Sequence, residues 1–89
     1  HSHAVGIAGF LSGAEIGSFR VRKNAPIEGE SLRGGLLRTR SGATVVAIKR
    51  GDEITANPDP IWEFQMDDIA LLLATPEQMR VAAKLFEPG

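Results

Sequence analysis

The chain has 89 residues, which is enough for one domain or one piece of a longer protein. Its formal net charge of −1 argues against a nucleic-acid partner, because proteins that bind DNA or RNA are usually strongly basic. The absence of cysteine excludes disulfides and thiolate metal sites. No apolar run approaches the ~20 residues of a membrane-spanning helix. We therefore expect a cytosolic protein without direct membrane insertion.

Residues 1–3, HSH, have the composition of an affinity-tag remnant and include both histidines of the chain. Without them the sequence lacks histidine, cysteine and tyrosine. Histidine is the side chain that most often serves in general acid–base catalysis. We therefore expect no enzymatic activity, no metal and no cofactor. Residues 4–13, AVGIAGFLSG, are apolar without a clear period and indicate a linker or the end of an upstream helix, and the domain itself is expected over residues 14–87.

Residues 14–22 alternate apolar and polar side chains and predict a first strand, followed by a loop over residues 24–30. Ser31 is suited to cap a short helix, because its hydroxyl can accept a hydrogen bond from a backbone N–H two or three residues on. This helix would carry Leu32 and Leu36 on one face and two glycines in its middle.

Residues 44–48, TVVAI, are rich in β-branched side chains without polar alternation, which predicts a strand covered on both faces. Gly51-Asp52 predicts a hairpin turn, because glycine supplies the positive φ of such turns, and residues 53–56 form the returning strand. The NPDP sequence at 57–60 ends that strand, since each proline removes a hydrogen-bond donor. Lys49 and Arg50 keep the hairpin elbow polar.

Residues 69–74, IALLLA, predict a second continuously apolar strand after a turn at Asp67-Asp68. The TPEQ sequence at 75–78 then begins a helix, with threonine as the cap, proline at the first helical position and glutamine completing a capping box. The apolar stripe of this helix consists of Met79, Ala82, Ala83 and Phe86. The order of strand, short helix, three strands and helix predicts a small α+β domain with a mixed sheet.

Five basic residues form the candidate anion site that residue types suggest: Arg33, Arg38, Arg40, Lys49 and Arg50. The guanidinium groups of arginine suit phosphate oxygens. The same five residues could instead form a solvated rim of the domain, and the residue types alone favour this second interpretation. Asp67 and Asp68, with Asp59 and Glu63, lack the spacing of a calcium loop, and turn formation explains the aspartates. Trp62, Phe64, Leu32 and Leu36 are expected in the core, or in a core that two subunits share.

Four segments taken together resemble the TrkA-C domain, the C-terminal half of the module that regulates potassium conductance (RCK). They are the first strand, the loop that ends at Ala25-Pro26, ESLRGGLLRTRSGATVVAIKRGDEITANPDP, and FQMDDIALLLATPEQMRVAAKLF. The resemblance covers about residues 14–86 and depends on the order and spacing of these segments.

The resemblance implies a homodimeric regulatory domain on the cytoplasmic side of the plasma membrane, as part of a potassium channel or another cation transporter. It also implies an upstream Rossmann-like or membrane domain as partner, and in some family members cyclic di-AMP binds between two subunits. Carried over by position, the ligand-facing residues are Leu32, Arg33, Arg38, Arg40, Ala43, Thr44 and Pro60. Arg38 would contact phosphate, and Leu32 and Pro60 would form apolar walls for adenine.

Several positions depart from the family's pattern. Arg33 and Arg40 stand where apolar or aromatic residues are common, and neither Ala43 nor Thr44 is an obvious polar partner for adenine. Asp67 occupies a position that is often glycine. These departures favour the alternative of a structural dimerisation or docking module without a small-molecule ligand.

Overall fold

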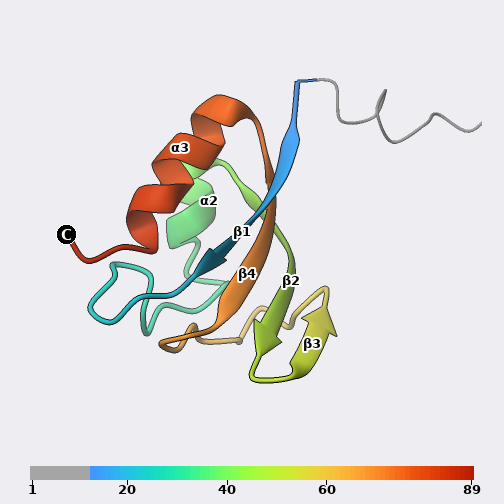
Figure 1. Cartoon of the computed structure of the whole chain (residues 1–89), viewed down its shortest axis with the longest axis vertical. Coiled ribbons are helices and arrows are strands. Elements are labelled where there is room, and N and C mark those ends of the chain that lie inside the picture. Colours follow the sequence, from blue (N-terminus) through green and yellow to red (C-terminus); the bar gives the residue numbers. More distant parts are fainter. Residues whose placement is uncertain (1–12) are drawn as a thin grey trace, which may run out of the picture.

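The structure, a computed structural model, describes residues 13–89 of the chain. This part contains β1 (Glu15–Arg20), α2 (Leu36–Ser41), β2 (Thr44–Arg50), β3 (Glu53–Ala56), β4 (Ile69–Ala74) and α3 (Pro76–Leu85) (Figure 1). The predicted α+β class and the predicted order of elements are confirmed. The predicted tag remnant and nearly all of the predicted linker, residues 1–12, lie outside the described residues.

The four strands form one sheet in the order β1-β4-β2-β3, and each neighbouring pair is antiparallel. The expected mixed sheet is therefore wrong. β2 and β3 run in opposite directions because the two-residue turn Gly51-Asp52 joins them. β4 lies between β1 and β2 and runs opposite to both, which leaves no parallel pair among residues 13–89.

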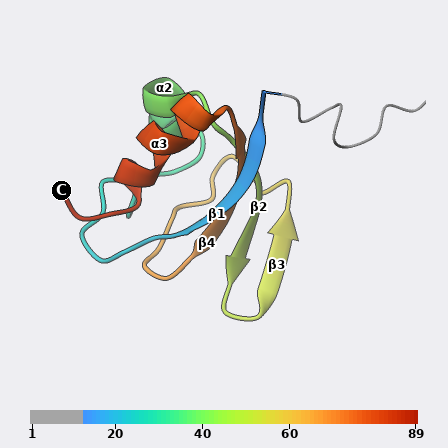
Figure 2. The same ribbon diagram turned by 45° about the horizontal axis from the view of Figure 1, so that its top comes forward.

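Both helices lie on the same face of the sheet (Figures 1 and 2). α3 packs against β1 and β4, and α2 packs against α3. Beneath this layer Ala70, Leu72 and Ala74 of β4 are buried, whereas the residues between them are half-buried. The prediction that residues 44–48 are covered on both faces is wrong, because Val46 stays 39% exposed. A single helical layer leaves the other face of the sheet open.

The short helix begins later than predicted. Ser31 forms an isolated β-bridge with Glu63, and its hydroxyl accepts a hydrogen bond from the Gly34 N–H at 3.1 Å. The two glycines precede the helix, and Gly35 is its N-cap residue with φ 75°. Residues with a Cβ are strained at this φ, so glycine lets the chain turn sharply into α2.

The C-terminal helix begins as predicted. The Thr75 hydroxyl accepts from the Gln78 N–H at 3.1 Å, and the Gln78 side-chain oxygen accepts from the Thr75 N–H at 2.9 Å. Of the four residues expected in the core, Phe64 is fully buried, and Trp62, Leu32 and Leu36 pack against the core while remaining partly buried. Within residues 13–89, no helix has the length and hydrophobicity needed to cross a bilayer.

Candidate functional site

A cleft of about 410 Å³ opens beside α2. Its lining comes from residues 27–38 before and within α2, residues 43–45 at the start of β2, and residues 57–60 after β3, together with Phe64. The volume lies within the range of about 300–1,000 Å³ that is typical of small-molecule sites. Three stretches that are distant in the sequence thus form one site.

Backbone hydrogen bonds hold two walls of the cleft together. The segment before α2 lies beside the segment after β3: the Leu32 N–H donates to the Trp62 carbonyl at 2.9 Å, and the Arg33 N–H donates to the Pro60 carbonyl at 2.8 Å. These bonds join backbone atoms, so they do not depend on which side chains face the cleft. They keep Leu32, Arg33 and Pro60 at the same edge of the cleft.

Six of the seven residues predicted to face a ligand line this cleft: Leu32, Arg33, Arg38, Ala43, Thr44 and Pro60. The seventh, Arg40, is exposed on α2 and is not among the residues that line this cleft. Residues two positions apart in a helix point about 200° apart, so Arg40 points away from the side of α2 on which Arg38 lines the cleft. The structure adds Asn57, which sequence reasoning assigned to a strand-ending turn.

Arg33 and Arg38 supply the positive charge of the cleft, and both are exposed. Neither belongs to any of the ion pairs found among residues 13–89. The acidic lining residue is Glu30, and Leu32 and Pro60 add apolar surface. An unpaired guanidinium beside apolar walls suits an anionic ligand that also has a planar or apolar part.

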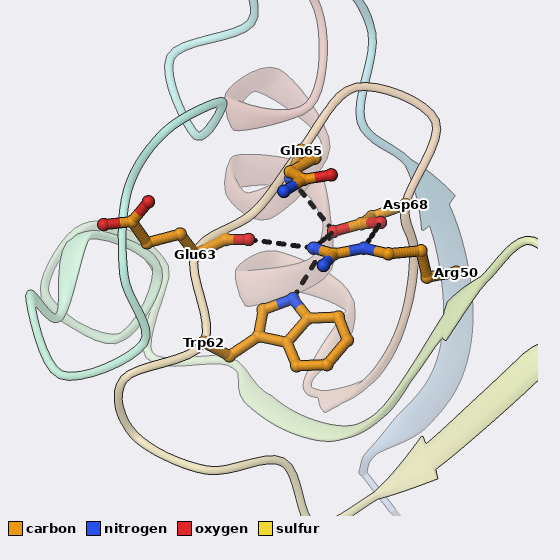
Figure 3. Close-up of polar contacts among 5 residues, drawn as sticks. All are labelled: Arg50, Trp62, Glu63, Gln65 and Asp68. Carbon is orange, nitrogen blue, oxygen red and sulfur yellow. Dashed lines mark hydrogen bonds and ion pairs between the residues drawn. The ribbon is translucent and has the colours of Figure 1, made fainter.

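Arg50, at the end of β2, lies at the centre of a second polar arrangement (Figure 3). Its Nε donates to Asp68 Oδ1 at 2.8 Å and its Nη2 donates to Asp68 Oδ2 at 2.7 Å, which makes a bidentate ion pair. Nη2 also donates to the Glu63 carbonyl at 3.0 Å, and Cζ lies 4.1 Å from the centroid of the Trp62 ring. Asp68 is 2% exposed and also accepts from the Gln65 N–H at 2.9 Å.

This arrangement keeps both members of the ion pair charged at neutral pH. Burial alone would raise the pKa of the Asp68 carboxyl, but the hydrogen bonds from Arg50, Gln65 and Trp62 and the positive charge of Arg50 outweigh burial and lower that pKa. The hydrogen bond to Asp68 likewise raises the pKa of Arg50.

Arg50 was predicted to keep the hairpin elbow polar, and Asp68 was predicted to form a turn. In the structure the two residues instead form an ion pair with each other. Sequence reasoning missed their pairing because 18 residues separate them and no local pattern connects them. Through Trp62 and Glu63, Arg50 also holds the segment that carries Pro60 into the cleft. Residues 13–89 contain no cluster of three or more acidic side chains that could hold a metal ion.

Comparison with known proteins gives a partial match to a potassium channel. Potassium channel protein 1 of Methanocaldococcus jannaschii is 29% identical to this chain over 65 residues, which cover 73% of this chain and 20% of that protein. The chain thus spans about a fifth of the length of this relative.

Two solved structures share the fold. The RCK C domain of the potassium transport protein KtrA, in complex with cyclic di-AMP, has a TM-score of 0.70 and 20% identity, and the match covers 83% of this chain and 85% of that one. The RCK_C domain dimer of S. agalactiae BusR, also in complex with cyclic di-AMP, has a TM-score of 0.74 and 17% identity, covering 84% and 93%.

The sequence of residues 16–87 matches the TrkA-C domain family, and this range holds every helix and nearly every strand residue of the structure. The resemblance inferred from the order and spacing of the sequence segments is confirmed, and the solved RCK C-terminal domains show the same fold. This chain belongs to the TrkA-C domain family.

Proposed function

We propose that this domain is a ligand-sensing regulatory domain of a potassium or other cation channel or transporter, acting as a homodimer on the cytoplasmic side of the membrane. Its ligand is a cyclic dinucleotide such as cyclic di-AMP, bound between two subunits. The observation that carries this proposal is the cleft in which Arg33 and Arg38, both without an ion-pair partner among residues 13–89, stand beside the apolar Leu32 and Pro60.

The residue types of the cleft match the parts of such a ligand. A guanidinium binds phosphate oxygens through charge-assisted hydrogen bonds, which are stronger than neutral ones. Leu32 and Pro60 give apolar surface on which a base can pack. Cyclic di-AMP consists of two identical halves, so a two-fold pair of clefts could hold one half each.

Regulation then follows from population shift. A ligand shared by two subunits favours the relative orientation to which it binds more tightly, and an upstream Rossmann-like or membrane domain receives that bias through the chain that precedes β1. The proposal involves no chemical step, no cofactor, no nucleic acid and no insertion into the bilayer.

The alternative function is a structural dimerisation or docking module without a small-molecule ligand. One observation favours it: Ala43 is only 4% exposed and Thr44 has a single hydroxyl, so neither of these two cleft residues provides the paired donor and acceptor that a base edge requires.

Calorimetric titration with cyclic di-AMP separates the two functions, with Arg38→Gln and Arg40→Gln as a matched pair on the same helix. For the ligand sensor we expect binding with one ligand per pair of chains, weakened about tenfold or more by Arg38→Gln, because charged hydrogen bonds are lost. Arg40→Gln should bind like the wild type, since Arg40 lies outside the cleft. Absence of binding to the wild-type protein would support the docking module, and equal effects of the two substitutions would contradict the assignment of the cleft.

A further inference from the structure

The polar side chains that line the cleft differ in what they can recognise: Glu30, Ser31, Arg33, Arg38, Thr44 and Asn57. Arginine side chains donate and carboxylates accept, so neither type offers both kinds of group. The Ser31 hydroxyl already accepts a hydrogen bond from the Gly34 N–H at 3.1 Å. Among these lining residues, Asn57 alone carries a donor and an acceptor side by side in one planar group.

The backbone of Asn57 is fixed where β3 ends. Its N–H donates to the Val46 carbonyl at 3.0 Å, its φ is 51°, and Pro58 follows it. Asparagine and glycine adopt positive φ more readily than other residues. The turn geometry therefore explains why position 57 is occupied by a residue of this kind. The turn does not require the carboxamide, which is exposed and makes no hydrogen bond to another residue in the range 13–89.

We propose, on the basis of the function proposed above, that Asn57 is the residue that selects the base of the ligand and that it selects adenine. A carboxamide pairs with adenine through N6–H and N7, one donor and one acceptor. Guanine offers two acceptors, O6 and N7, at the same edge, so a carboxamide satisfies one of them at most. Asn57 thereby supplies the polar contact that Ala43 and Thr44 lack.

The cleft then divides recognition among three parts of the chain. Arg38 on α2 binds the phosphate, Leu32 and Pro60 pack against the base, and Asn57 binds the edge of the base. Asn57 and Pro60 belong to the same short turn, whose two prolines restrict the backbone. A restricted backbone fixes the direction in which the Asn57 side chain leaves the chain relative to the Pro60 wall, and this limits where the carboxamide can meet a base.

The test compares Asn57→Gly and Asn57→Asp with the wild type by calorimetric titration of cyclic di-AMP and cyclic di-GMP. Glycine suits the positive φ and removes the carboxamide, so the fold is retained, which urea unfolding checks. We expect the wild type to prefer cyclic di-AMP, and we expect Asn57→Gly to bind it about tenfold or more weakly and to lose most of the preference. Asn57→Asp keeps the shape and can still accept from adenine N6–H, but it has no N–H to donate to N7, so it should bind cyclic di-AMP more weakly than the wild type while still disfavouring cyclic di-GMP.

The outcomes separate the two proposals. If the wild type and Asn57→Gly both bind cyclic di-AMP with the same preference over cyclic di-GMP, Asn57 is a turn residue and the inference is overturned, while the proposed function stands. If the wild type binds cyclic di-AMP but shows no preference over cyclic di-GMP, base selection is overturned in the same way. If the wild type binds neither ligand, both proposals fail.

Discussion

Asp67 has a left-handed backbone conformation, with φ 74°, although it carries a Cβ atom. It lies in the turn before β4, and its side chain is exposed. Glycine would adopt this φ without steric cost. At the residue scale, Asp67 therefore carries local strain that its neighbours in the turn must tolerate.

We predict that Asp67→Gly is more stable than Asp67→Ala by about 1 kcal/mol, because alanine keeps the steric penalty at positive φ and glycine removes it. Urea unfolding of both variants measures the difference. Gly51→Ala is a matched control: Gly51 has φ 62° and nothing within 4 Å of an added Cβ, so this substitution reports the backbone cost alone. Equal stability of the two Asp67 variants would contradict the prediction.

At Asp68, the next residue, the contribution to stability depends on charge rather than on backbone strain. Its pKa is lower in the folded protein than its ordinary value of 3.8, so the unfolded chain binds more protons at acid pH. The stabilisation from this carboxylate is complete above about pH 4 and is lost as the pH falls through the folded-state pKa.

We predict that Asp68→Asn lowers the free energy of unfolding by about 2–3 kcal/mol at neutral pH, since it removes one member of a largely buried ion pair. The difference from the wild type should be smaller at about pH 3 than at about pH 7, because below about pH 4 the unfolded chain binds a proton at Asp68 more readily than the folded protein does. Urea unfolding at both pH values measures it. Asp67→Asn, an exposed neighbour, should show little change, and a pH-independent difference for Asp68→Asn would rule out this explanation.

At the scale of elements, Arg50 connects the end of β2 to the segment between β3 and β4. Its side chain holds Asp68, the Glu63 carbonyl and the Trp62 ring, and the Trp62 carbonyl in turn accepts the Leu32 N–H at 2.9 Å. Loss of the Arg50 side chain should therefore loosen the wall of the cleft that carries Leu32, although Arg50 does not line the cleft.

We predict that Arg50→Met speeds amide hydrogen exchange at Leu32 and Arg33, whose N–H groups bond to the Trp62 and Pro60 carbonyls. Lys49→Met is the matched control, because Lys49 is exposed on the same strand and makes no ion pair among residues 13–89. Exchange at α3 amides serves as an internal reference for global stability. If exchange rises equally at α3 and at Leu32, the effect of Arg50 is on the whole fold and not on the cleft wall.

At the scale of the whole molecule, one helical layer covers one face of the sheet (Figure 2). The cleft opens beside the shorter helix. If the ligand is shared by two clefts, ligand binding and dimerisation are thermodynamically linked: each strengthens the other by the same factor. An ordinary one-cleft ligand would leave the association of subunits unchanged.

We predict that cyclic di-AMP increases the dimer fraction in sedimentation velocity at protein concentrations near the dimer dissociation constant. Arg38→Gln should reduce this increase, because its phosphate contact is lost, and Arg40→Gln should not. Binding of the ligand without any change in the dimer fraction would contradict a ligand shared between subunits.

Much of the fold could be predicted from local patterns. β-branched residues marked β2, the TPEQ sequence marked the start of α3, and Gly51 marked the hairpin, since each of these signals acts through the backbone of its own residues. The start of α2 was predicted wrongly because Ser31 can make the same hydrogen bond in an isolated turn as in a helix cap, and sequence alone does not distinguish the two.

The sequence by itself therefore determined the family and the order of the elements, because these depend on short-range patterns and on spacing along one chain. The family resemblance added six of the residues that line the candidate cleft. The tertiary structure alone decided that Arg50 pairs with Asp68, that Arg40 lies outside the cleft and that Asn57 lies within it. These facts depend on how the sheet and the turns bring distant segments together, and each of them is a contact or an orientation that no local pattern encodes.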